Sequence, residues 1–217
     1  MTLNKQTGNM YPWVMYTWNP IRGKCPHECL YCYMRRFKAG KLRLDEKCLN
    51  DNLGEGKVIF VGSSVDMWAE QVPSEWILRV LEHCRNFDNK YLFQSKNPKR
   101  FLDFIPEFPD VYLGTTIESN VHYPTITKAP SPEERMMVMT HINKPKMVSI
   151  EPILEFDLEE LTTYIEAISP EFVSIGADSQ GHNLPEPSPE KVKMLIAELK
   201  KFTEVKIKDN LNRLVNV

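Results

Sequence analysis

Short apolar runs alternate along the chain with longer stretches in which apolar residues recur at helical spacing. The short runs are rich in β-branched and aromatic residues, which is typical of strands. The predicted strands are Trp13–Trp18, Lys57–Val61, Tyr91–Phe93, Val111–Thr116, Met147–Ile150, Phe172–Ile175 and Glu204–Ile207. The predicted helices are Ser74–Arg85, Ser131–Ile142, Leu158–Ile168 and Pro189–Phe202. This alternation indicates an α/β protein with a mainly parallel sheet covered by helices.

The units are too few and too short, in 217 residues, for a standard eight-unit barrel. A partial, open α/β barrel fits better, and we expect a single domain over residues 1–217 with its core at about 11–210. Within Ser74–Arg85, Ser74 is expected to cap the helix. The weak pattern of Gly40–Gly56 predicts a connection or an irregular helix.

Composition narrows the class of protein. Hydrophobic residues make up 42% and charged residues 26%, which argues against a disordered chain. The net charge is −2, so no global basic field indicates nucleic acid. Apolar runs such as Val58–Val61 are too short to cross a bilayer, and Met1–Met10 lacks the apolar core of a signal peptide. We therefore expect a cytoplasmic protein without a membrane partner.

Polar residues directly follow each predicted strand. Because ligands of parallel α/β folds bind beyond the carboxyl ends of the strands, these loops predict a polar pocket at one rim. The alternative is that each loop is polar only because its backbone meets water. The loops are Asn19-Pro20, Gly62–Asp66, Gln94–Lys96, Thr116–Asn120, Glu151-Pro152, Gly176–Ser179 and Lys208–Asn210.

The five cysteines are not expected to form disulfides in a reducing cytosol. Cys25, Cys29 and Cys32 have C-x3-C-x2-C spacing, which favours a soft metal or an iron–sulfur cluster. A structural zinc site usually has four ligands in two pairs, and there is no second pair. Cys84 lies on the apolar stripe of a helix and is interpreted as a core residue. A zinc site or reduced surface thiols are the alternatives.

The C-x3-C-x2-C motif, with Tyr31 before its last cysteine, resembles the radical S-adenosylmethionine superfamily. The resemblance implies a partial (β/α)6 TIM-like barrel and a [4Fe-4S] cluster held by Cys25, Cys29 and Cys32. It also implies that S-adenosylmethionine binds the open iron and is reductively cleaved to a 5′-deoxyadenosyl radical.

A closer resemblance, over roughly Trp13 to Asp209, is to a family of phage-protein-like sequences of unknown function. It rests on Thr17–Pro20, Val61–Asp66, Phe93–Arg100, Ser149–Pro152 and Val205–Lys208. Where those relatives usually have Gly-Gly-Glu-Ser, this chain has Gly176-Ala177-Asp178-Ser179.

The superfamily resemblance implies roles for several rim residues. Tyr31 is expected near the adenine, and the Gly62-Ser63-Ser64 strand end near the amino group of the methionine moiety. The ribose hydroxyls and the methionine carboxylate region are assigned to residues after the fourth and fifth strands. These residues are Thr116, Glu118, Asn120, Ser149 and Glu151. For each of them an ordinary structural role is the alternative.

Three charged residues are candidates for catalysis. Lys96 and Lys208 end strands, and a lysine in a dry pocket can bind a carboxylate, hold a substrate anion or donate a proton. Asp66 is expected to orient a lysine or bind substrate. His27 lies inside the cysteine motif, where it is expected to shape the loop or to tune the sulfur atoms by hydrogen bonding. A solvated surface position is the alternative for the lysines and for Asp66.

Two basic clusters suggest phosphate contacts, although a charge run is more often a solvated face. They are Arg35, Arg36, Lys38, Lys41 and Arg43, and Lys96, Lys99 and Arg100.

The leading hypothesis is a radical S-adenosylmethionine enzyme acting on a nucleobase, nucleoside or nucleic acid, with a peptide or small metabolite as runner-up. The electron source is expected to be a reductant such as flavodoxin or ferredoxin. The alternatives are a non-catalytic iron–sulfur or zinc protein that binds nucleic acid or a partner, and an electron-transfer protein.

Overall fold

A computed structural model describes residues 3–8 and 10–215. Its elements comprise strands, four α-helices and short 3-10 helices among these residues. The strands are β1 (Asn4–Lys5), β2 (Tyr16–Trp18), β3 (Ile21–Arg22), β4 (Arg43–Leu44), β5 (Val58–Val61), β6 (Lys90–Ser95), β7 (Val111–Thr116), β8 (Lys146–Ile150), β9 (Phe172–Ile175) and β10 (Glu204–Ile207). The α-helices are α1 (Ser74–Arg85), α2 (Pro132–Thr140), α3 (Leu158–Ile168) and α4 (Pro189–Leu199). The 3-10 helices are η1 (Tyr33–Arg36), η2 (Glu46–Asn50), η3 (Pro98–Glu107) and η4 (Asp209–Arg213).

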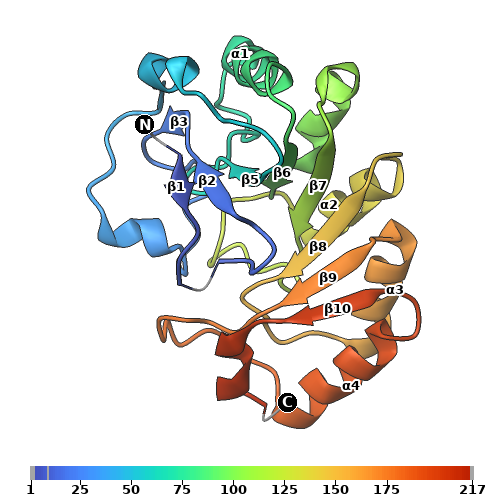
Figure 1. The fold of residues 1–217 in the computed structure, drawn as a ribbon. Helices are drawn as coiled ribbons and strands as arrows, with labels where there is room; N and C mark the ends of the chain where they lie inside the picture. Colours follow the sequence, from blue (N-terminus) through green and yellow to red (C-terminus); the bar gives the residue numbers. More distant parts are fainter. Residues whose placement is uncertain (1–2, 9, 216–217) are drawn as a thin grey trace.

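One 8-stranded sheet dominates the fold, in the order β1-β2-β5-β6-β7-β8-β9-β10. Every pair from β2 to β10 is parallel, and only β1 is antiparallel to its neighbour β2. The mainly parallel α/β sheet expected from the sequence is therefore confirmed. Figure 1 shows the helices along one side of the sheet, with the early part of the chain at the other. No helix in the part of the chain that the structure describes is long and apolar enough to cross a membrane.

The helices begin where the sequence provides capping groups. Ser131 and Glu134 form a reciprocal capping box at the start of α2, and Asp157 caps α3 by accepting from the Glu160 amide. The expected cap of α1 was wrong: Pro73 holds the N-cap position, and Ser74 is the first helical residue. The Ser74 hydroxyl instead accepts a hydrogen bond from Arg100 at 3.1 Å.

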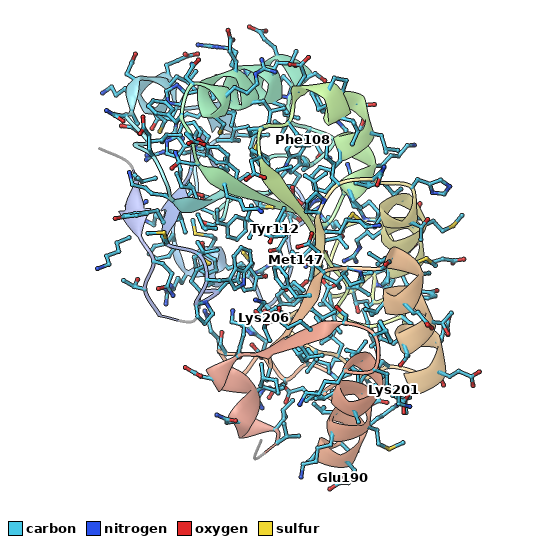
Figure 2. All side chains as sticks on the ribbon, turned by 45° about the vertical axis from the view of Figure 1, so that its right-hand side comes forward. Phe108, Tyr112, Met147, Glu190, Lys201 and Lys206 are labelled. Atoms are coloured by element: carbon cyan, nitrogen blue, oxygen red, sulfur yellow. The ribbon has the colours of Figure 1, made fainter. Side chains whose placement is uncertain are left out.

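Each parallel strand sends alternate side chains to opposite faces of the sheet. On β7, Val111 and Leu113 join the main apolar core, whereas Tyr112 joins a second cluster with Met147 and Phe172. In Figure 2 Tyr112 and Met147 lie on the side of the sheet away from α3 and α4, and Phe108 lies higher in the view. This second cluster forms an apolar floor on the face that carries the candidate site.

Local departures from the expected elements occur where the strands are short. β3 and β4 pair as a separate two-stranded antiparallel sheet, which the weak pattern of this region did not reveal. β2 begins at Tyr16, three residues later than expected. Only β3 therefore stands between β2 and the cysteine motif, and the motif lies in the long connection from β3 to β4.

Candidate active site

The cysteine loop, Cys25 to Cys32, is attached to the segment that follows β7. The Leu30 amide donates to the Ile126 carbonyl at 2.9 Å, and the Lys128 amide donates to the His27 carbonyl at 2.8 Å. Glu28 has a positive φ of 48° and pairs with both Lys24 and Lys128. The loop thus has a defined backbone shape that rests on contacts about 100 residues away in sequence.

All three motif cysteines are free thiols. Cys29 is 6% exposed, and its Sγ lies 3.2 Å from the Thr127 hydroxyl, whereas Cys25 and Cys32 are half-buried. Burial and the nearby Asp66 carboxylate raise the pKa of Cys25 to about 12. A thiolate in this environment therefore needs a compensating cation.

Asp66, in the loop after β5, has a side chain that is 10% exposed and accepts several hydrogen bonds. Its Oδ2 accepts from His27 Nε2 at 2.8 Å, from the Ser95 hydroxyl at 2.9 Å and from the Lys96 amide at 2.8 Å. Burial alone would raise the pKa of Asp66, but the charge and hydrogen bond of His27 outweigh it and lower this pKa. Asp66 thus joins the cysteine loop to the end of β6, and it contacts the backbone of Lys96 rather than its ammonium.

The polar turn after β5 is organised by Asn19. Asn19 Oδ1 accepts from the Ser64 amide at 2.9 Å and from the hydroxyls of Ser63 and Ser64 at 3.2 and 3.0 Å. Gly62 has a φ of 80°, and a Cβ there would lie 3.2 Å from the Val65 carbonyl oxygen. Glycine is therefore required for a turn that exposes backbone and hydroxyl groups at the rim.

A buried cluster surrounds Glu118, in the loop after β7. Glu118 Oε1 accepts from Lys96 Nζ at 2.7 Å and from the Tyr31 hydroxyl, while Oε2 accepts from Arg135 Nη1 at 2.7 Å. The ammonium of Lys96 lies 5.2 Å from the centre of the Tyr31 ring. Burial would raise the pKa of Glu118, but the charges of Arg135 and Lys96 hold it well below its usual range. Glu118 is therefore an ionised carboxylate at neutral pH.

Arg135, on α2, is a site residue that sequence reasoning missed. It is 1% exposed and also donates to the carbonyls of Thr116 at 2.5 Å and Pro130 at 2.9 Å. Arg135 lies three residues after Pro132 and four before Met139, both buried. This helical spacing on a buried face was the signal that could have identified it.

A second buried cluster lies around Glu151, after β8. Its Oε2 accepts from Lys208 Nζ at 2.8 Å, and its Oε1 accepts from the Ser174 hydroxyl at 2.8 Å. The Lys208 ammonium lies 4.8 Å from the centre of the Tyr11 ring. Burial raises the pKa of Glu151, although Lys208 opposes the shift. The two glutamates are thus held in opposite electrostatic environments.

Tyr11 is a second residue that sequence reasoning missed. Its hydroxyl lies 2.9 Å from both the Ser149 hydroxyl and Gln94 Oε1, and Gln94 Nε2 donates to the Thr116 hydroxyl at 3.0 Å. Tyr11 precedes the first long strand, so nothing local in the sequence indicated that it enters the site. These contacts bring Ser149 and Thr116 into one polar network with the second cluster.

Two polar residues that the sequence drew attention to lie in other surroundings. Asn120 accepts from the Asp157 amide at 2.8 Å and donates to Glu160 at 2.7 Å, so it fastens the start of α3. Asp178 accepts from the His182 ring at 2.7 Å and from the Gln180 amide at 3.1 Å, within its own loop. The side-chain bonds of both residues thus go to nearby structural groups.

Comparisons with solved structures define the class of fold. A double mutant of spore photoproduct lyase with bound AdoMet and dinucleoside spore photoproduct matches with a TM-score of 0.63 and 10% identity, covering 93% of this chain and 78% of that one. SuiB of Streptococcus suis, bound to the precursor peptide SuiA, matches with a TM-score of 0.60 and 9% identity, covering 88% of this chain and 48% of that one. This chain shares the fold of both structures.

The family follows from the sequence match. The chain belongs to the family described as "Protein of unknown function (DUF5131)", whose match covers residues 9–195. A search of curated proteins finds no match.

Proposed function

We propose that this protein is a radical S-adenosylmethionine enzyme. The observation that carries the proposal is the position of three free thiols on one loop, joined through Tyr31 to the buried Lys96–Glu118 pair. When bound, the [4Fe-4S] cluster and S-adenosylmethionine supply a 5′-deoxyadenosyl radical that abstracts a hydrogen atom from the substrate. The shared fold with radical S-adenosylmethionine enzymes supports this assignment. A reductant such as flavodoxin or ferredoxin supplies the electron.

Cys25, Cys29 and Cys32 fit a cluster better than a single ion. Within residues 3–8 and 10–215, no three His, Cys, Asp or Glu side chains are grouped so that they could hold one metal ion. In a [4Fe-4S] cluster each thiolate binds a different iron, so the sulfur atoms stand further apart. Cys25, Cys29 and Cys32 would hold such a cluster with one position left for S-adenosylmethionine. The contact of Thr127 with Cys29 supplies a hydrogen bond that tunes the sulfur.

The rim residues form the cradle for S-adenosylmethionine. The Gly62-Ser63-Ser64 turn offers backbone and hydroxyl groups to the methionine amino group, and Tyr31 packs near the adenine. The carboxylates and hydroxyls along β7 and β8 bind the ribose and the methionine end. These residues are Thr116, Glu118, Asn120, Ser149 and Glu151. Asn120 takes part only if it exchanges its present bonds with the start of α3.

The two lysine–glutamate pairs have different tasks. Glu118 remains ionised and holds the positively charged side chains of Lys96 and Arg135 in place. The positive charge fixed in this way orients a bound carboxylate. Glu151 takes up a proton more readily, so its Oε2 and Lys208 Nζ hold or move a proton beside the substrate. Asp66 positions Lys96 through the Lys96 backbone amide.

The substrate is a nucleobase, a nucleoside or a nucleic acid. The structure of spore photoproduct lyase with a dinucleoside supports this class. SuiB, with its bound precursor peptide, makes a peptide the second candidate. Nucleosides, oligonucleotides and peptides therefore form the first substrate screen.

Cleavage of S-adenosylmethionine tests the proposal. The protein is reconstituted anaerobically with iron and sulfide, reduced with dithionite and assayed for 5′-deoxyadenosine by mass spectrometry. We expect about four irons per chain and 5′-deoxyadenosine above the level of a protein-free control. Cys29→Ala should abolish both, whereas Cys84→Ala, a buried thiol on α1 away from the loop, should retain both. One zinc per chain, or product formation by Cys29→Ala at the wild-type rate, would contradict the assignment.

A further inference from the structure

The segment after the cysteine loop is strongly basic. Between Glu28 and Asp45 the sequence contains no acidic residue. Two exposed aromatic rings stand there among five exposed cations. We call these residues the basic strip: Tyr33, Arg35, Arg36, Phe37, Lys38, Lys41 and Arg43, all of them exposed. In a chain with a net charge of −2, this concentration of positive charge is local.

The cations of the basic strip are not neutralised by carboxylates, although Arg35 also donates to the Glu28 carbonyl at 3.3 Å. Neighbouring cations have carboxylate partners: Arg22 pairs with Asp45 at 2.9 Å, and Lys24 and Lys128 pair with Glu28. Among the described residues, no cation of the basic strip pairs with a carboxylate. Their charges are therefore available to an external anion.

The aromatic rings of the strip are exposed. Phe37 is 52% exposed and the Arg36 guanidinium lies 5.0 Å from the centre of its ring. Tyr33 is 37% exposed, and its hydroxyl donates to the Ser63 carbonyl at 3.1 Å, which fixes the ring. Exposed aromatic rings among cations are the pattern by which proteins bind single-stranded nucleic acid, since bases stack on rings while cations meet phosphates.

The basic strip lies beside the candidate active site. It begins one residue after Cys32, and the contact of Tyr33 with Ser63 places it against the Gly62–Ser64 turn. In Figure 1 this segment, in the lighter blue, runs outside the sheet near β1 and β2. A nucleic-acid strand bound there passes next to the site at which S-adenosylmethionine is proposed to bind.

The second basic cluster of the sequence has a structural role instead. Lys96 pairs with Glu118, and Arg100 is 8% exposed. The Arg100 guanidinium donates to the carbonyls of Ala69 and Val72 at 3.3 Å. Lys99 is the one exposed member of that cluster, so the basic strip offers far more exposed cations to phosphates.

We infer that the basic strip binds single-stranded nucleic acid, with its cations on the phosphates and with Tyr33 and Phe37 stacked on bases. This inference rests on the proposed function in choosing a nucleic acid over an acidic protein as the anionic partner. From Tyr33 to Lys38 the same segment offers two exposed rings on which bases can stack and three exposed cations for phosphates. An acidic protein surface offers carboxylates to the cations but no bases to the rings.

The test is binding of a fluorescently labelled single-stranded oligonucleotide to the reconstituted protein, measured by anisotropy at several salt concentrations. Each neutralised phosphate of a single strand contributes a slope of about −0.7 to log affinity against log salt. Five cations give a slope of about −3.5, or roughly a hundredfold weaker binding between about 50 and 200 mM salt. Replacing Arg36, Lys38 and Lys41 together by Gln should make the slope shallower by about 2. Phe37→Ala should weaken binding by about five- to 150-fold.

Matched controls lie on α4 and just after it. Lys193→Gln, Lys200→Gln and Lys201→Gln together remove the same charge from exposed positions, and Met194→Ala trims a side chain that is 54% exposed. We expect both controls to bind like the wild type. Poly-glutamate serves as the anionic polymer without bases, and we expect it to bind more weakly and to be insensitive to Phe37→Ala.

The outcomes separate this inference from the proposed function. Formation of 5′-deoxyadenosine without binding of the oligonucleotide would overturn the inference alone. Oligonucleotide binding that is lost in the strip variants supports the inference even where no 5′-deoxyadenosine forms. An equal loss of binding in the α4 control would overturn the inference in favour of a general charge effect. Poly-glutamate binding that is as tight as oligonucleotide binding and unchanged by Phe37→Ala would overturn it in favour of an acidic protein partner.

Discussion

The Arg135–Glu118 pair provides the sharpest test of how the site is built. Arg135→Met keeps a long apolar stem but removes the guanidinium, which donates to the Glu118 carboxylate at 2.7 Å and to the carbonyls of Thr116 and Pro130. Removing one partner of a buried ion pair costs about 3 to 5 kcal/mol. Lys96 and Tyr31 still bind the carboxylate, so we expect a loss of about 3 kcal/mol, at the lower end of that range.

For a chain of this length, that loss corresponds to a fall in Tm of about 6 to 12 °C. Urea unfolding followed by circular dichroism, with equal metal loading of variant and wild type, measures the free energy directly. The matched control is Arg79→Met, which breaks the exposed pair of Arg79 with Glu46 on the protein surface. Solvent screens an exposed pair, so we expect the control to lose little stability. A loss below about 1 kcal/mol for Arg135→Met, or an equal loss in both variants, would refute the view that the buried pair organises the site.

Three further predictions concern the rim and the floor of the site. Gly62→Ala forces a side chain onto a φ of 80°, and we expect a loss of stability of about 1 to 3 kcal/mol by urea unfolding, with wild-type stability as the contrary result. Tyr11→Phe removes the hydrogen bond to Ser149 and should cost about 1 kcal/mol, whereas an unchanged unfolding midpoint would show that the hydroxyl contributes nothing. Lys128 and Lys24 lower the pKa of Glu28 to about 2, so the stabilisation of the cysteine loop is complete above the ordinary value of 4.5 and is lost as the pH falls toward 2. Hydrogen exchange at the Leu30 amide should lose protection across that pH range in the wild type, and Glu28→Gln should abolish this dependence on pH.

The regular elements were predictable because their signals are local. The bounds of α1, α3, β7, β9 and β10 in the structure agree with those expected from the apolar pattern alone. Each of these segments packs apolar side chains against the main core, either at helical spacing or within a short strand. Because the buried positions must be apolar, the spacing of apolar residues in the sequence indicates the type of element. The hairpin β3–β4 has strands of two residues, too short to carry any periodic signal.

The site was predictable only in part, because its chemistry depends on distant partners. The rim loops identified Lys96, Glu118, Glu151 and Lys208, but their pairing across 22 and 57 residues is a consequence of strand order. Tyr11 reaches Ser149 from 138 residues away, and no local pattern marks it. The sequence alone also could not distinguish cations that bind groups inside the fold, such as Lys96 and Arg100, from cations that stay exposed at the surface.

Electron paramagnetic resonance of the reduced, reconstituted protein, with and without S-adenosylmethionine, tests the central claim most directly. The claim is that Cys25, Cys29 and Cys32 hold a [4Fe-4S] cluster with one iron open to S-adenosylmethionine. We expect the signal of a reduced [4Fe-4S] cluster whose shape changes when S-adenosylmethionine is added. Absence of a cluster signal, or a spectrum that S-adenosylmethionine leaves unchanged, would contradict the account.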